Sequence, residues 1–236
     1  MAMIESLEGR TLFVTVTAVQ LAGPVTKGTT HSYLVTNSGN YAGTATETEY
    51  GPIRMNGKTV YKDETSTTNS VGQYSGVVGT YGLLNNRYGQ TTYQSTSVGP
   101  GKASSRTIVG TQFDPAQTQL PGTMASGQTY TSIGTATEST RVGTAAATVR
   151  SYAYSVAQSL RAKATSVKTA VGTYRCFIVD TTVTAVVNGV TRTTAMSSYY
   201  SVGVGLVKRI LVASMSGSNT KTSTEQSLIG FKVGKG

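Results

Sequence analysis

Residues 171–208 contain two reversals of the chain, and they constrain the fold more than any other segment. Asn188-Gly189 separates two runs in which apolar and polar residues alternate. An Asn-Gly pair in this position favours the positive φ angles of a tight hairpin turn. The glycine-bearing segment from Ser201 to Gly205 reverses the chain again. We therefore predict three consecutive antiparallel strands, at residues 174–185, 190–200 and 206–214.

The remaining chain also has the character of β-structure. Only 13% of the 236 residues are charged and 38% are hydrophobic, and threonine, serine and valine are abundant. β-Branched residues fit the pleated, half-buried surface of a sheet. Further strands are expected at residues 12–20, 32–36, 41–50, 73–84, 90–97, 128–138, 146–155 and 226–233, with a hairpin around Asn56-Gly57. The predicted fold is mainly β: a single antiparallel domain over residues 1–236, built as one large curved sheet (half-barrel or sandwich) with at most one short helix.

Two segments leave alternatives open. Residues 113–127 contain Asp114-Pro115, Leu120-Pro121-Gly122 and Ser126-Gly127, and these turn-forming residues indicate a loop or crossover between two groups of strands. A subdivision of the domain would fall there. Residues 153–170 place several apolar side chains at near-helical spacing, whereas their serines and threonines lower helix propensity. A basic amphipathic helix and a pair of strands both fit this segment.

Few residues of the chain could perform catalysis or hold a metal. His31 is the one histidine, so a metal site with two histidines is excluded, and its polar neighbours predict a solvated turn. Cys176 is the one cysteine, so the chain can form neither an internal disulfide nor a zinc cluster. Its apolar neighbours predict a small buried side chain rather than a reactive thiol. We expect no cofactor and no metal.

The carboxylates and glycines show no catalytic pattern either. Glu47 and Glu49 are expected on one face of one strand, where they could serve glycoside chemistry or bind calcium. The first use needs two carboxylates facing across a cleft and the second needs more oxygen ligands, so a solvated sheet edge is favoured for this pair and for the turn-like pair Asp63-Glu64. Gly203-Val204-Gly205 lacks the helix and Lys-Ser/Thr of a phosphate-binding loop. We predict no catalytic, cofactor-binding or metal-binding residue, and no enzyme.

The basic residues and the tyrosines are the remaining candidates for binding. The net charge is +10, from 20 basic and 10 acidic residues, but the basic residues are scattered and Lys208-Arg209 is their tightest group. Nucleic-acid binding is therefore not expected. The tyrosines suit carbohydrate or protein contacts and, equally, ordinary cross-strand packing. They are Tyr74, Tyr81, Tyr88 and Tyr93, which cluster in sequence, and Tyr199-Tyr200, which would lie on both faces of a strand.

The C-terminal third resembles a known family. Residues 169–179 with Cys176, the Asn188-Gly189 hairpin, and the run from Tyr199 to Lys208 are similar to the TapB-like family of bacterial envelope β-proteins of unknown function. The resemblance is specific over about residues 169–208, where Val171 stands in place of the usual alanine. It implies a curved sheet similar to that of the LolA and LolB lipoprotein carriers, whose concave face holds acyl chains.

Two functions from different classes follow. The first is a non-enzymatic, envelope-associated binding module whose concave sheet face holds an apolar or lipid-like ligand through residues that the sequence does not identify. The second is a structural subunit that assembles with itself through edge strands into a surface layer, filament or capsid-like array. The start of the chain, Met1 to Glu8, lacks the features of an export signal, and no apolar run is long enough for a transmembrane segment. The resemblance nevertheless places the protein in the cell envelope or outside the cell.

Overall fold

The structure is a computed structural model that describes the backbone of residues 14–17, 20–21, 23, 26–38, 40–55, 58–69, 74–84, 87–98 and 106–235. Side chains are described at these positions except residues 41, 51–106, 116, 118 and 119. Strands make up most of this part of the chain. They are β1 (Thr15–Thr17), β2 (Thr30–Asn37), β3 (Asn40–Met55), β4 (Lys58–Asn69), β5 (Tyr74–Leu84), β6 (Arg87–Val98), β7 (Arg106–Leu120), β8 (Thr123–Ala125), β9 (Thr129–Val142), β10 (Thr148–Leu160), β11 (Thr165–Thr169), β12 (Gly172–Val187), β13 (Val190–Ser201), β14 (Gly205–Met215) and β15 (Thr222–Lys232).

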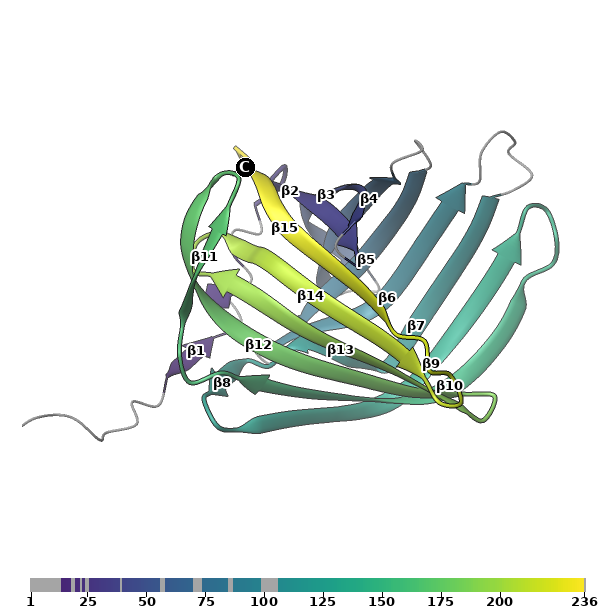
Figure 1. The fold of residues 1–236 in the computed structure, drawn as a ribbon. Coiled ribbons are helices and arrows are strands. Elements are labelled where there is room, and N and C mark those ends of the chain that lie inside the picture. Colours follow the sequence, from purple (N-terminus) through teal and green to yellow (C-terminus); the bar gives the residue numbers. More distant parts are fainter. Residues whose placement is uncertain are drawn as a thin grey trace, which may run out of the picture.

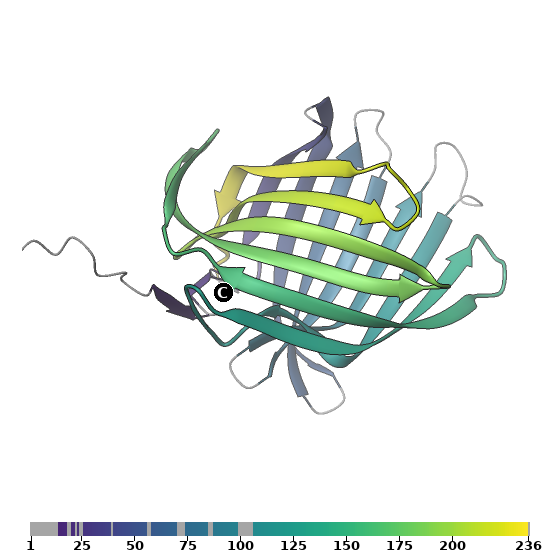
Figure 2. The ribbon, with the colours of Figure 1, turned by 60° about the horizontal axis from the view of Figure 1, so that its bottom comes forward.

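One antiparallel sheet of thirteen strands curves back on itself (Figures 1 and 2). Its strands follow the order β10-β9-β7-β6-β5-β4-β3-β2-β15-β14-β13-β12-β11. An additional pairing joins β10 to β12, with Tyr154 opposite Ala185 and Leu160 opposite Val179. Within the described chain, every strand of this sheet except β11 therefore has a paired neighbour on both sides. The short strands β1 and β8 pair with each other in a separate two-stranded sheet.

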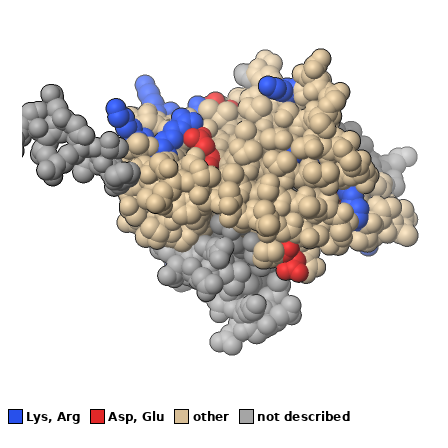
Figure 3. Space-filling view, turned by 90° about the horizontal axis from the view of Figure 1, so that it is seen from below, with Lys and Arg blue, Asp and Glu red and all other residues tan. Residues whose placement is uncertain are grey.

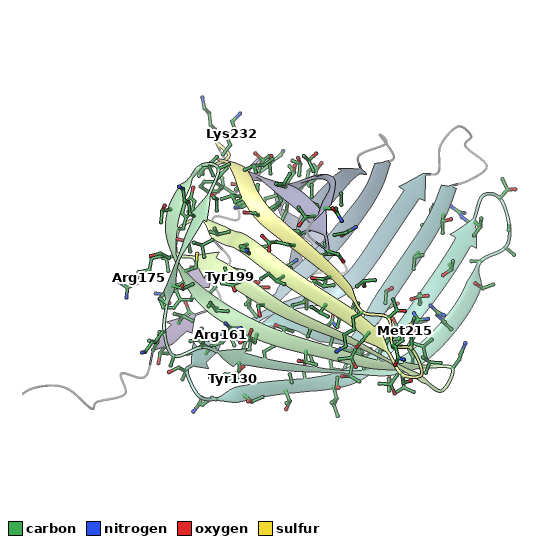
Figure 4. The ribbon with its side chains drawn as sticks, in the orientation of Figure 1. Tyr130, Arg161, Arg175, Tyr199, Met215 and Lys232 are labelled. Atoms are coloured by element: carbon green, nitrogen blue, oxygen red, sulfur yellow. The ribbon has the colours of Figure 1, made fainter. Side chains whose placement is uncertain are left out.

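The two ends of the curved sheet differ. At one end, which we call the capped end, β1, β8 and the β11–β12 hairpin lie together (Figure 1, left). The other end, which we call the turn end, carries the turns that follow β9, β12 and β14, and Met215 lies there (Figure 4). In the turn between β12 and β13, Asn188 and Gly189 have φ angles of 52° and 76°, as the predicted tight hairpin requires.

Two clusters of buried hydrophobic side chains join the strands toward the capped end. A first cluster joins the two-stranded sheet to the joint between β10 and β12. It contains Val16, Leu21, Leu120, Met124, Leu160 and Val179. A second cluster joins β11 to β2, β3, β14 and β15. It contains Tyr33, Val35, Ala45, Val167, Cys176, Leu206, Val207 and Leu228. Because all of these side chains are buried, this end of the sheet is closed by packing.

The predicted fold class is confirmed: the chain forms a single large curved antiparallel sheet. The three strands expected at residues 174–185, 190–200 and 206–214 are β12, β13 and β14. Residues 153–170 belong to β10 and β11, so the pair of strands is confirmed and the helix alternative is wrong. Asn56 and Gly57 lie outside the described residues, although Met55 and Lys58 pair on either side of them.

Two details of the sequence prediction are wrong. Residues 113–127 are not a loop, because they include the end of β7 and all of β8. Pro115, which has no N–H group, is accommodated where the pairing of β7 with β6 shifts between Gln112 and Gln117. Asp63-Glu64 is neither a turn nor a sheet edge, because it lies within β4, between β3 and β5. The assignment of residues 1–236 to one domain stays a prediction.

Candidate functional site

The register of the strands defines which side chains point inward. Side chains alternate between the two faces of a strand, and directly paired residues share a face. One row of paired residues runs across the sheet from Val179 through Ser198, Arg209 and Gln226 to Val35. Val179, Ser198 and Val35 are only 1%, 4% and 7% exposed. This row therefore faces the inside of the curved sheet, as does every second residue from its members toward the turn end, where the pairing of these strands has no register shift.

Apolar side chains on this inward face stay partly accessible between the buried row and the turn end. Five half-buried residues of β12, β13 and β14 share this property, and we call them the inner apolar face. They are Val183, Ala185, Met196, Leu211 and Ala213. Since they point into the curved sheet and are still accessible, solvent reaches the inside of the sheet at this level.

A buried cluster that includes Tyr154 borders the inner apolar face on the side of β9 and β10. Ala136, Tyr154 and Val156 form a core cluster against which Val183 and Ala185 pack. The Tyr154 hydroxyl donates a hydrogen bond to the Pro115 carbonyl oxygen over 2.6 Å, which satisfies its polar atom. The inward surface here is therefore apolar in character.

A half-buried arginine lies on the inward face toward the capped end. Arg209 donates from Nε to Ser198 Oγ over 3.3 Å, and the Tyr200 side chain also hydrogen-bonds to it. Burial alone would lower the pKa of Arg209, but Tyr200, Glu47 and Tyr33 together raise it above its ordinary value. The guanidinium thus stays charged inside the protein.

Tyr33 connects this arginine to the carboxylates of β3. Its hydroxyl donates to the Leu206 carbonyl oxygen at 3.1 Å and lies 3.3 Å from Glu47 Oε2. Burial, followed by the charge of Glu47, raises the pKa of Tyr33 well above its ordinary value. Burial and the charge of Glu47 also raise the pKa of Glu49, to about 7. The predicted shared strand for Glu47 and Glu49 is confirmed, but the predicted solvated edge is wrong, because β3 is paired with both β2 and β4.

His31 is buried rather than in a solvated turn, so that prediction is wrong. It lies at the start of β2, directly opposite Glu47, and is 4% exposed. Its Nε2 atom is 2.6 Å from the Val204 carbonyl oxygen, and its ring packs 4.9 Å from the ring of Phe231, measured between centroids. In the described part of the chain, no group of three His, Cys, Asp or Glu side chains could hold a metal ion.

Cys176 is a buried free thiol, as predicted. Burial raises the pKa of this thiol to about 11, so it carries its proton at neutral pH. Tyr199 and Tyr200 lie on opposite faces of β13, and both pack against the second core cluster. The side chains of the other predicted tyrosines, at positions 74, 81, 88 and 93, lie outside the described residues.

Charged side chains also occur on the inward face at the turn end. Arg150 of β10 forms an ion pair with Glu138 of β9, its directly opposite residue. Tyr152 hydrogen-bonds to Glu138 as well. Arg192 of β13 lies directly opposite Ala185 and is exposed. Neither arginine was predicted as a binding residue, because their inward position depends on how the sheet closes.

The two members of the predicted basic group point to opposite faces. Lys208 points outward, where its Nζ lies 2.8 Å from Glu225 Oε1, whereas Arg209 points inward. Exposed basic side chains gather instead beside β11 at the capped end, at Lys163, Lys168 and Arg175. Figure 3 shows basic side chains at this end and a largely uncharged surface beyond it.

The outer face has its own apolar feature. A shallow groove of about 460 Å³ lies over β9, β10 and β12, and Ile133, Ala153 and Val186 contribute to its lining. Ile133 and Val186 are exposed. No helix in the described chain is long and apolar enough to cross a membrane.

Comparison with known proteins does not assign the chain to a family. No protein-family profile and no curated protein sequence matches it, so the resemblance to the TapB-like family stays a prediction. Two solved structures are similar in backbone. A candidate lipoprotein from Parabacteroides distasonis ATCC 8503 has a TM-score of 0.45 and 13% identity, over 89% of this chain and 97% of that one. A candidate exported protein with a YmcC-like fold from Bacteroides fragilis NCTC 9343 has a TM-score of 0.47 and 8% identity, over 91% and 99%. Both scores are too low to support a conclusion about function.

Proposed function

We propose that the protein is a non-enzymatic binding module of the cell envelope that holds an apolar or lipid-like ligand inside its curved sheet. The observation that carries this proposal is the inner apolar face. Its residues point inward and remain half-buried, whereas Val179, Ser198 and Val35, nearer the capped end on the same face, are buried. Covering such a surface with an aliphatic chain would be favourable by about 25 cal/mol for each Å² removed from water.

The polar groups inside the sheet support a binding role over a catalytic one. His31 and Cys176, the two side chains best suited to nucleophilic or general-base chemistry, are both buried. His31 uses Nε2 in a contact with a backbone carbonyl oxygen, and the pKa of Cys176 is raised to about 11. The Arg209 guanidinium is held by Ser198 and Tyr200. The envelope location in this proposal rests on the sequence resemblance over residues 169–208.

The pairing of the strands does not favour the alternative of self-assembly through edge strands. Assembly of that kind needs unpaired backbone groups along a strand edge. In the described chain, β11 is the one strand of the large sheet with a neighbour on a single side, and it has five residues. β1 and β8, with three residues each, are the other short strands with free edges.

The binding proposal is tested with two adjacent residues that face opposite ways. Leu211 belongs to the inner apolar face, and Val212 points outward from the same strand; both are half-buried. We expect Leu211→Gln to weaken the binding of a fluorescent long-chain aliphatic probe by about tenfold or more, and Val212→Gln to leave it nearly unchanged. Thermal unfolding of both variants controls for a general loss of structure.

Two results would contradict the proposal. One is that the wild-type protein binds no aliphatic probe and releases no lipid on extraction with organic solvent. The other is that both glutamine variants bind as the wild-type protein does. Native mass spectrometry of the same samples separates monomers with bound lipid from assemblies of many copies without lipid, which would favour the alternative function.

A further inference from the structure

We propose that the ligand is an anionic amphiphile, whose aliphatic chain lies on the inner apolar face and whose acidic head group binds at Arg192, beside Arg150, at the turn end. This inference rests on the proposed function, because it names the class of ligand that would occupy the same face. Three features of the turn end carry it: an apolar rim, two arginines that converge from different strands, and a surplus of positive charge.

The rim consists of inward-pointing apolar side chains that are exposed. In the strand register, Val142 lies opposite Thr107, Val190 lies opposite Val187, and Met215 lies opposite Arg192. They are 53%, 38% and 49% exposed. On the same face nearer the capped end, Val179 and Ser198 are only 1% and 4% exposed, so the inward face is more open to solvent at the turn end, although Val187 there is buried. A chain-like ligand would enter there and meet apolar side chains first.

The two arginines lie next to the rim and close to one phenol. Arg150 projects from β10 and Arg192 from β13, so they come from strands on the two sides of β12. The positive charges of both lower the pKa of Tyr152, although burial and Glu138 raise that pKa in sum. Both guanidinium groups therefore act on the same small region of the inward face.

The charge balance at this position is positive. Glu138 forms an ion pair with Arg150, whereas Arg192 has no ion-pair partner among the described residues. Arg192 also lies opposite Ala185 of the inner apolar face on one side and Met215 of the rim on the other. A guanidinium binds carboxylate or phosphate oxygens through two parallel hydrogen bonds. A ligand with an aliphatic chain and an acidic end would therefore fit here, with its chain on the inner apolar face and its acidic end at Arg192.

The test compares one aliphatic chain with and without its charge. The probes are cis-parinaric acid, a fluorescent fatty acid, and its methyl ester. We expect the wild-type protein to bind the acid about tenfold more tightly than the ester, because an ion pair with Arg192 forms only with the acid. Arg192→Gln should remove this preference while leaving the affinity for the ester unchanged, and Arg192→Lys should keep part of it.

Arg141 provides the matched control. It is exposed near the turn end and lies an odd number of positions from Glu138 along β9, so it points outward. Arg141→Gln removes the same charge and should leave the preference for the acid intact. Equal binding of acid and ester by the wild-type protein, or an equal effect of the two glutamine variants, would overturn the inference and leave the proposed function standing. Binding of neither probe would overturn both.

Competition against bound cis-parinaric acid identifies the source of the head group. Oleate has a carboxylate head, and oleoyl lysophosphatidate presents a phosphate on the same chain. Displacement by either one supports the inference. The more effective of the two competitors indicates whether the ligand is a fatty acid or a phospholipid-derived molecule. Lysophosphatidylcholine, which has no net charge, should compete poorly, and displacement by it as effective as by oleate would contradict the role of Arg192.

Discussion

The joint between β10 and β12 predicts a specific loss of stability on shortening Leu160. This side chain is 2% exposed, lies opposite Val179 and packs in the first core cluster with residues of β1 and β8. Replacing a fully buried leucine with alanine costs about 2–5 kcal/mol, since apolar contacts are lost and a cavity is left. Leu160 contacts several elements that cannot all move in to fill the space, so we expect about 3 kcal/mol for Leu160→Ala.

Leu34→Ala is the matched control for this prediction. Leu34 is on the outward face of β2 and is 37% exposed, so its loss should cost less than about 1 kcal/mol. Urea unfolding followed by far-ultraviolet circular dichroism measures both free energies. In thermal unfolding, Leu160→Ala should lower the midpoint by about 6–12 °C, at about 2–4 °C for each kcal/mol in a chain of this size. A cost for Leu160→Ala no greater than that for Leu34→Ala would refute the packed joint between β10 and β12.

Three further predictions concern single side chains. The Cys176 thiol should react with a disulfide reagent at pH 8 only after unfolding, because it is buried and its pKa is about 11; fast reaction of the native protein would contradict its position. Gly134→Ala should destabilise the fold, because a Cβ atom there would lie 2.7 Å from the Tyr154 hydroxyl oxygen. Gly110→Ala is its control in the same unfolding assay, because a Cβ atom at position 110 has nothing within 4 Å. The pKa of Glu49 is about 7 in the folded protein, and its ordinary value is 4.5. The unfolded chain therefore loses this proton at lower pH than the folded protein does. The free energy of unfolding should fall as the pH rises from about 4.5 to about 7. Glu49→Gln should flatten this part of the pH profile and be relatively more stable at pH 8, and an unchanged profile would show that Glu49 titrates normally.

The parts of the fold that sequence could predict are those with a local cause. Asn188-Gly189 determines its hairpin through its own backbone preferences, and the alternation of residues on either side specifies two strands. The same alternation predicted the strand at residues 146–155, of which residues 148–155 belong to β10. Residues 153–170 also have apolar side chains at near-helical spacing. The part of this segment in β10 is nevertheless a strand, because β10 pairs with both β9 and β12.

The parts that could not be predicted depend on contacts between distant residues. The polar neighbours of His31 indicate a solvated turn, but the residue is buried by contact with Val204, 173 positions further along the chain. Lys208 and Arg209 are indistinguishable in sequence, and only the closure of the sheet places one outside and the other inside. For the same reason, no local signal identified Arg192 or the inner apolar face as candidate binding residues.

A single tryptophan placed inside or outside the sheet tests the binding proposal most directly. The chain contains no tryptophan, so Ala213→Trp and Ala195→Trp each introduce a unique fluorophore. Ala213 belongs to the inner apolar face, and Ala195 is exposed on the outward face of the neighbouring strand. Bromine atoms quench tryptophan on close contact, so a fatty acid brominated along its chain reports which face it occupies. We predict saturable quenching of Ala213→Trp and little quenching of Ala195→Trp. Equal quenching of the two variants, or quenching of Ala195→Trp alone, would contradict a ligand held inside the curved sheet.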